Sequence, residues 1–195
     1  MNSRITVKEF DSPPVDKREI KRYLGIGEAD EKTEELIDSC LDMMRGLSYR
    51  VAFSEYGIKR DGDLLDLGFA RVKSRGLAKN LDGCESILLF AATVGREIDR
   101  LIARYERTEP SRAVCLQAIG SERVEALCDL FCDGLKAERE IKPRFSPGYG
   151  DLDLSLQKDI SDALALEKTL GITLSEGLLM TPSKSVTAIV GIKKK

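Results

Sequence analysis

The feature that most constrains the fold is the apolar run Ser-Ile-Leu-Leu-Phe-Ala-Ala-Thr-Val at residues 86–94. It is the most apolar stretch of the chain, and its length suits a strand better than a helix. A strand with apolar side chains on both sides has no side suited to water, so it belongs inside a sheet that is covered on both faces. The run therefore predicts a buried central strand with other elements packed above and below it.

Helical and strand patterns surround this run without regular alternation, which predicts an α+β fold. We expect a mostly antiparallel sheet with long helices packed around it. The helical patterns cover residues 16–24, 30–45, 74–81, 97–107, 110–140 with a bend at Gly120, and 154–169. The other strand patterns are a hairpin or two antiparallel strands within 48–67 with a turn at Asp61-Gly62, a short strand at 172–174, and a β-branched run at 185–192.

The length of 195 residues and the hydrophobic content of 42% predict a single domain over residues 1–195. Residues 1–28 are predicted to form an N-terminal arm and a short helix. The helices at 16–24 and 30–45 are expected to be packing elements without chemistry of their own. The formal net charge of −2 argues against nucleic acid or an anionic membrane as the main partner. No apolar run reaches about 18 residues and no signal peptide is evident, so we expect a cytoplasmic location.

The chain contains no histidine, which excludes Ser-His-Asp and Cys-His nucleophile pairs and most catalytic zinc sites. It has five cysteines, an odd number spread over a mid-sized chain, which is not the pattern of a disulfide framework. Cys128 and Cys132 share a helix face and offer a metal ligand pair in principle. Because no second close pair exists, we favour buried thiols that behave as small hydrophobic side chains, and we predict no metal site.

Residues 144–151, Arg-Phe-Ser-Pro-Gly-Tyr-Gly-Asp, form the segment richest in candidate chemistry. Pro147 fixes its own φ, whereas Gly148 and Gly150 permit positive φ and a close backbone approach. The result is a stiff loop that presents one guanidinium, one aromatic face and several free backbone donors. Such a loop suits a ligand with a carboxylate and a flat ring. An ordinary turn with an exposed arginine explains the residue types equally well.

The segment 144–149 resembles the Arg-Pro-x-Pro-Gly-Tyr signature of the activation domain of cobalamin-dependent methionine synthase. A second group of residues resembles the Leu-Thr-Glu-Ser, Met, Pro and Ser-Val signature of that domain, in the same order and at similar spacing. This group comprises Leu174-Ser175-Glu176, Met180, Pro182 and Ser185-Val186. The resemblance covers roughly residues 110–190, and the chain is more similar to short, free-standing relatives than to the domain fused to the full synthase.

The resemblance implies a binding site for S-adenosylmethionine. Arg144 would meet the ligand carboxylate as a bidentate fork, a strong geometry for that pair. On residue type alone Glu125 is a solvated helix glutamate. The resemblance instead implies that it contacts the ligand, accepting a hydrogen bond from the ammonium or the ribose.

The remaining implied contacts lie in the loop itself. Tyr149 would cover the adenine or the sulfonium methyl, because an aromatic face attracts a cation. Backbone groups at Ser146 and Gly148 would read the purine edge. The fused domain also has an N-terminal acidic and aromatic segment with no recognisable counterpart in residues 1–60, and Asp151 is a candidate for one of the missing acidic contacts.

In function, the resemblance implies an activation subunit that supports reductive remethylation of cobalamin. The cobalamin is expected to be held by a methionine synthase subunit, and an electron donor protein is the second expected partner. No catalytic residue is predicted, because the methyl acceptor is the reduced cobalt and needs no acid or base from this chain. The alternative is a non-catalytic interaction or sensor module that keeps the fold and binds a corrinoid protein or another nucleotide-like ligand.

Overall fold

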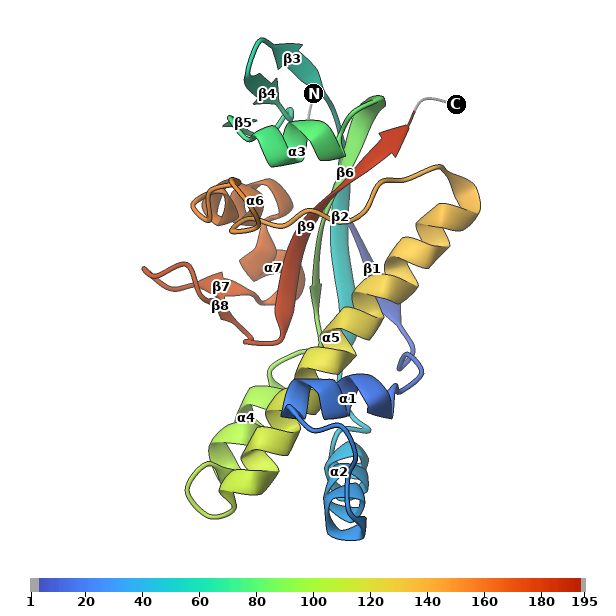
Figure 1. Cartoon of the computed structure of the whole chain (residues 1–195). Coiled ribbons are helices and arrows are strands. Elements are labelled where there is room, and N and C mark those ends of the chain that lie inside the picture. The colour runs from blue at the N-terminus through green and yellow to red at the C-terminus, as the bar shows by residue number, and fades with distance from the viewer. Residues whose placement is uncertain (1–3, 194–195) are drawn as a thin grey trace.

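A four-stranded antiparallel sheet forms the centre of the molecule (Figure 1). The computed structural model describes residues 4–193. In sheet order the strands are β1 (Thr6–Phe10), β2 (Tyr49–Gly57), β6 (Cys84–Thr93) and β9 (Ser185–Lys193). The α+β fold predicted from the sequence is confirmed.

Strand β6 is the buried central strand that residues 86–94 predict. Its side chains alternate between two separate hydrophobic cores, one on each face of the sheet. Leu88 and Phe90 enter the first core, whereas Ile87 and Leu89 enter the second. Both faces must therefore be covered, which explains why the run has no polar side.

The first face of the sheet is covered by one long helix, α5, and by shorter helices that pack against it. Figure 1 shows α5 running diagonally across the sheet with α1, α2 and α4 near one end. The bounds are α1 (Lys17–Leu24), α2 (Glu31–Met43), α4 (Glu97–Tyr105) and α5 (Pro110–Glu138). Helix α5 continues through Gly120, where a Cβ would lie 3.0 Å from Ile98 Cγ1 and from Lys184 Cγ. This glycine thus permits close packing within a continuous helix.

The second face is covered by shorter elements. Strands β3, β4 and β5 form a small antiparallel sheet, and β7 pairs with β8 as a separate hairpin. The turn predicted at Asp61-Gly62 joins β3 to β4, whereas the strand earlier in the 48–67 pattern, β2, pairs with β1 and β6 and not with β4. The bounds are β3 (Lys59–Asp61), β4 (Leu64–Asp66), β5 (Arg71–Val72), α3 (Arg75–Asn80), α6 (Leu156–Leu164), α7 (Leu166–Leu170), β7 (Thr173–Leu174) and β8 (Met180–Thr181).

The helix predicted over residues 154–169 is wrong in one respect, because it is broken at Ala165. That residue adopts the left-handed conformation with φ 46° and separates α6 from α7. Leu164 and Leu166 are both buried, and residues two apart on a straight helix point in nearly opposite directions. The break lets both leucines enter the second core. Gln157 in α6 is also buried, and its Oε1 accepts a hydrogen bond from Thr187.

The N-terminal segment predicted over residues 1–28 contains β1 and α1, with residues 1–3 outside the described part of the chain. Asp16 caps the N-terminus of α1 by accepting from the Arg18 amide, and Gly25 ends the helix in the left-handed conformation. None of the helices within residues 4–193 combines the length and the apolarity needed to cross a membrane.

Candidate functional site

The 144–151 loop is reached by an extended segment that runs along the free edge of β9. The amide and carbonyl of Phe145 each pair with Ile189 at 2.9 Å, and Ile141 forms a second bridge to Ile192. Neighbouring side chains of an extended segment point to opposite faces. Arg144 accordingly lies on the α5 side of the sheet, whereas Phe145 is buried in the second core.

On the α5 side, Arg144 meets two carboxylates. Its Nη2 atom lies 2.7 Å from Asp129 Oδ1 and 3.2 Å from Glu125 Oε2. The two acids are four residues apart, so they share one face of α5. The side chain of Arg144 is only 25% exposed, whereas that of Glu125 is 44% exposed. The structure therefore brings together Glu125 and Arg144, two residues that the same family resemblance selected.

The loop after Phe145 is closed by its own backbone. Gly148 has φ 82° and donates its amide to the Leu152 carbonyl at 2.8 Å, while the Tyr149 amide donates to the Ser146 carbonyl at 3.1 Å. The backbone donors of Gly148 and Tyr149 are thus already used, contrary to the expectation that several donors are free. The Tyr149 side chain is 69% exposed and meets Phe145 edge to face, with ring centroids 5.4 Å apart.

Asp151 fastens the loop to the N-terminus of α3. One carboxylate oxygen accepts from the Ser74 hydroxyl at 2.6 Å and from the Gly76 amide at 3.0 Å, and the other accepts from the Arg75 amide at 2.7 Å. The hydrogen bond from Ser74, followed by those from the two amides, lowers the pKa of Asp151. Both oxygens are engaged, so Asp151 has a structural task, and its role toward a ligand remains a prediction.

Beside Glu125 and Asp129 lies a groove between α1 and α5, with a volume of about 420 Å³. Among residues 4–193, six carboxylates and no basic side chain line it, and each of these carboxylates is paired with a cation beside the groove, namely Arg18, Arg22, Arg123, Lys136 or Arg144. We call it the acidic groove, and its lining comprises Pro13, Pro14, Asp16, Glu19, Tyr23, Glu122, Glu125, Ala126, Asp129, Leu130 and Asp133. Arg144 stands next to this lining through its two carboxylate partners. A cationic ligand group would therefore share these carboxylates with the cations already paired with them, or displace those cations, and an anionic group would share the guanidinium of Arg144.

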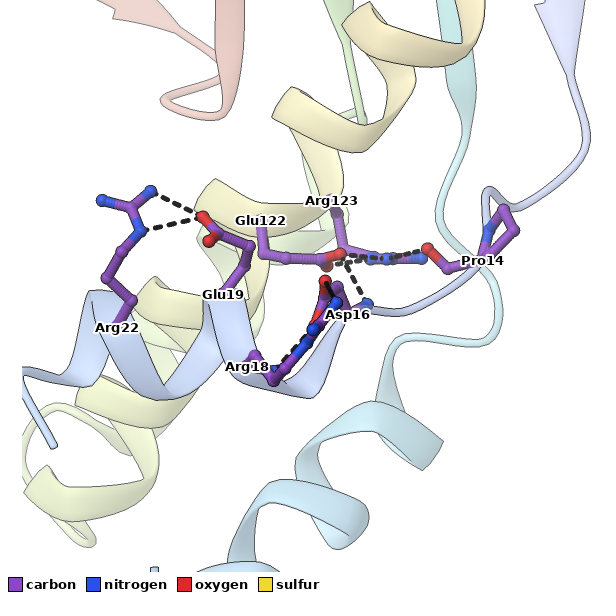
Figure 2. Close-up of polar contacts among 7 residues, drawn as sticks. All are labelled: Pro14, Asp16, Arg18, Glu19, Arg22, Glu122 and Arg123. Carbon is purple, nitrogen blue, oxygen red and sulfur yellow. Dashed lines mark hydrogen bonds and ion pairs between the residues drawn. The ribbon is translucent and has the colours of Figure 1, made fainter. Parts of the chain in front are cut away.

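One wall of the groove is the N-terminal arm, residues 11–16, which a buried ion pair holds against α5 (Figure 2). Arg123 donates from Nη1 to the Pro13 carbonyl at 2.6 Å and from Nη2 to the Pro14 carbonyl at 2.8 Å. Glu122 accepts from the Asp16 amide at 3.0 Å and pairs with Arg123 at 2.5 Å. Glu122 and Arg123 are only 3% and 2% exposed. The pair satisfies three backbone groups of the arm that have no partners within a helix or strand.

Comparison with solved structures identifies the fold. The crystal structure of the MetH reactivation domain bound to AdoHcy matches with a TM-score of 0.73, covering 96% of this chain and 78% of that chain, at 18% sequence identity. The fold is that of the MetH reactivation domain. At this level of identity the likeness establishes the fold alone. No protein-family model matches the chain, and no curated protein matches it in sequence.

Within the MetH reactivation domain fold, the predicted site residues fall into two groups. Glu125 and Arg144 meet on the α5 side and adjoin the acidic groove. Ser146, Gly148 and Tyr149 belong to the loop beyond the edge of β9, and they do not line the acidic groove. A ligand that contacts both groups must extend around this edge.

Sequence reasoning missed the contribution of the N-terminal segment. The helix at 16–24 was expected only to pack, yet Asp16, Glu19 and Tyr23 line the acidic groove. They bring two acids and one aromatic ring to its lining. One signal was present in the sequence: Arg123 lies four residues after Ile119 and four before Leu127, on the apolar stripe of α5. A charged residue at such a position requires a buried partner.

Proposed function

We propose that this chain is an S-adenosylmethionine-binding activation subunit that supports reductive remethylation of cobalamin in a cobalamin-dependent methionine synthase. The observation that carries the proposal is the meeting of Arg144 and Glu125 beside the acidic groove. The fold supports it, because the MetH reactivation domain with this fold was crystallised with AdoHcy bound.

The charges of the site fit S-adenosylmethionine. This ligand carries an ammonium and a sulfonium, which suit the exposed carboxylates of the acidic groove by sharing or displacing the cations now paired with them. Its carboxylate suits the guanidinium of Arg144, which can form two parallel hydrogen bonds. The volume of about 420 Å³ lies within the usual range for small-molecule sites. Tyr149 offers an exposed aromatic face for the adenine or the sulfonium methyl.

In this proposal the chain positions the methyl donor. The partner synthase subunit holds cobalamin, which supplies the methyl acceptor, and an electron donor protein supplies the reducing equivalent. Arg144 and Glu125 would fix the amino acid end of the ligand, and the loop would direct its methyl group toward the partner. A site without histidine suits such a role, because the chain itself moves no proton.

A second candidate is a non-catalytic interaction or sensor module with the same fold. The observation that favours it is that Arg144 is already paired with Asp129 and Glu125, so a ligand carboxylate must share or displace these partners. Such a module would bind a corrinoid protein or another nucleotide-like ligand through the same face.

Calorimetric titration of S-adenosylmethionine tests the proposal. The proteins are the wild type, Arg144→Ala, Glu125→Gln and the control Arg139→Ala. Arg139 lies beyond the C-terminal end of α5 and pairs with Glu55 at 2.7 Å, away from the acidic groove. Loss of a charge-assisted hydrogen bond weakens binding by about ten- to a hundredfold, so we expect that loss for Arg144→Ala and wild-type affinity for Arg139→Ala.

Equal affinities in the wild type and in a folded Arg144→Ala variant would reject this site. If the wild type binds nothing alone, the titration is repeated with the cobalamin-loaded synthase subunit present. Absence of binding in both titrations would reject the methyl-donor function and leave the interaction module.

A further inference from the structure

The two outer edges of the central sheet differ. The edge of β9 is paired by the chain itself, because Ile141 and Phe145 of the segment before the loop form bridges to it. The outer edge of β1 is paired with no strand among residues 4–193. The N–H and C=O groups along such an edge can pair with a strand from another molecule.

Strand β1 lacks most of the features that protect an edge from such pairing. It contains no proline, and its register with β2 is continuous, without a bulge. The charged side chains of Lys8 and Glu9 are its only protection. Between these charges and the start of the strand stands Val7, an apolar side chain that is 43% exposed. Val7 lies opposite Ala52 on the face of the second core, yet no residue of β1 packs against that core, so this side of the edge is open.

On the α5 side, a groove with a volume of about 540 Å³ runs beside the same edge. We call it the edge groove, and its lining includes Thr6, Lys8 and Phe10 of β1, Phe53 of β2, and Leu130 and Gly134 of α5. Leu130 is 39% exposed, and a Cβ at Gly134 would meet nothing within 4 Å. Glycine costs a helix interior about 1 kcal/mol relative to alanine. Packing within the chain does not require Gly134, in contrast to Gly120, so the space above it is left for groups from outside the chain.

The charges of β1 restrict how it can pair with a second copy of itself. Two copies of one strand that pair antiparallel are related by a two-fold axis, and opposite side chains lie on the same face of the joined sheet. Like charges that lie directly opposite each other destabilise such a pair. With Lys8 on the axis two ammonium groups meet, and with Glu9 on the axis two carboxylates meet. With Thr6 on the axis, Arg4 meets Lys8 of the other copy. These three registers are therefore disfavoured.

The register with Val7 on the axis brings no like charges together. Each Val7 then packs on Val7 of the second copy, which buries both exposed side chains. The flanking pairs across the two copies are Thr6 with Lys8, Ile5 with Glu9, and Arg4 with Phe10. The last pair places a guanidinium beside an aromatic ring, which is a favourable contact. The charge pattern and the exposed valine thus select the same register.

We propose that the edge of β1 is an interface between two copies of this chain, which pair antiparallel about a two-fold axis at Val7 and join their four-stranded sheets into one. Both copies use the same residues, so the interface is closed. The opposite edge of each sheet is already paired by Ile141 and Phe145, so this mode of association stops at two copies.

The second copy would lie next to the acidic groove. Leu130 and Asp133 line both the acidic groove and the edge groove, and the edge groove borders the paired strands. The pairing itself needs no ligand in the acidic groove, so this inference does not depend on the proposed function.

Size-exclusion chromatography with light scattering tests the proposal on the full chain over a dilution series. We expect the wild type to have twice the mass of one chain. Val7→Lys places two ammonium groups opposite each other, so its mass should fall twofold, to that of one chain. The control is Val114→Lys, the same substitution of an exposed valine on α5, which should keep the wild-type mass. Circular dichroism checks that both variants remain folded.

Engineered disulfides test the register. Opposite residues of an antiparallel pair have Cα atoms about 4.5–5.5 Å apart, which a disulfide can span. Val7→Cys should therefore cross-link two copies under mild oxidation. In Glu9→Cys the two thiols would be displaced by four residues, about 14 Å along the strands, and should stay uncross-linked. The five native cysteines are buried, so they do not compete in the folded chain. Non-reducing electrophoresis measures the cross-linked fraction.

A mixture of two variants separates specific pairing from random collision. In Thr6→Cys or Lys8→Cys alone, the two thiols are displaced along the strands by about 7 Å in addition to the spacing between them, too far for a disulfide. In a mixture of the two variants, position 6 of one copy lies opposite position 8 of the other. The mixture should therefore cross-link to a greater extent than either variant alone.

The proposal would be overturned if the wild type kept the mass of one chain at every dilution, and the edge of β1 would then be left for a strand of another protein. It would also be overturned if a folded Val7→Lys variant kept the doubled mass, because the interface would then lie elsewhere. Cross-linking of Glu9→Cys as fast as that of Val7→Cys would reject pairing about Val7.

Discussion

Two carboxylates, Glu122 and Asp151, each hold a segment of the chain against a helix that is distant in sequence. The first lies in a buried ion pair and the second is exposed to solvent. Glu122, together with Arg123, holds the N-terminal arm against α5. Asp151 holds the 144–151 loop against the N-terminus of α3. Each fastening positions a segment proposed to adjoin the ligand, so both bear on function.

The difference lies in burial. The Glu122–Arg123 pair is almost completely buried, and each charge there depends on the other, because an isolated ion in the interior is strongly disfavoured. Asp151 is exposed, and water can replace its partners. The stability lost when one of these contacts is removed therefore depends on the group that loses its partner. Removing Arg123 leaves an uncompensated buried charge, whereas removing the Asp151 carboxylate leaves a helix end that water can solvate.

The largest expected effect comes from Arg123→Leu. This change leaves the Glu122 carboxylate buried without its cation, and we expect a loss of about 3–5 kcal/mol in the free energy of unfolding. Urea unfolding followed by circular dichroism measures it. The matched control is Lys136→Leu, which removes an exposed pair with Asp133 on the same helix and should cost about 0–1 kcal/mol. Similar losses in the two variants would show that burial does not distinguish these pairs.

A smaller effect is expected when both charges are removed together, in Glu122→Leu/Arg123→Leu. No buried charge remains, so the loss should come mainly from the arm groups that lose partners, about 1–3 kcal/mol. The double variant should therefore be more stable than Arg123→Leu alone. Limited proteolysis should cut near residues 11–16, because the arm has lost its anchor. A double variant less stable than the single one would contradict this account.

Local patterns were sufficient for most of the fold. The run at 86–94 required two covered faces, and the caps at Asp16 and Gly25 marked a helix correctly, because each rests on residues close in sequence. The break at Ala165 escaped prediction, since the pattern fits a continuous helix and only the position of the second core demands the turn.

The candidate site was only partly predictable for the same reason. Arg144 and Glu125 were selected by the family resemblance, and the structure places Arg144 Nη2 at 3.2 Å from Glu125 Oε2. The hydrogen bond from Ser74 to Asp151 joins residues remote in sequence, and no local pattern encodes it. Likewise, Asp16 reaches the acidic groove only because the buried pair on α5 holds the arm there.

A modest effect is expected from Asp151→Ala. The change removes the acceptor of two backbone amides at the N-terminus of α3, so the melting temperature should fall by roughly 2–4 °C. The control is Glu85→Gln on β6, an exposed side chain with no ion pair or side-chain hydrogen bond among residues 4–193. If Glu85→Gln lowered the melting temperature as much as Asp151→Ala, the hydrogen bonds of Asp151 would not contribute to stability beyond the effect of removing any exposed acid.

The smallest expected effect is a pH dependence, and it sharpens the contrast between the two fastenings. The pKa of Asp151 lies below its ordinary value of 3.8, so its ionised form is favoured by folding. This contribution is complete above the unfolded value and disappears as the pH falls through the lower folded value. The stability difference between the wild type and Asp151→Asn should therefore be present at about pH 6 and shrink progressively below about pH 4. Urea midpoints across this range measure it, and a difference that stayed constant with pH would show that the charge of Asp151 plays no part in holding the loop.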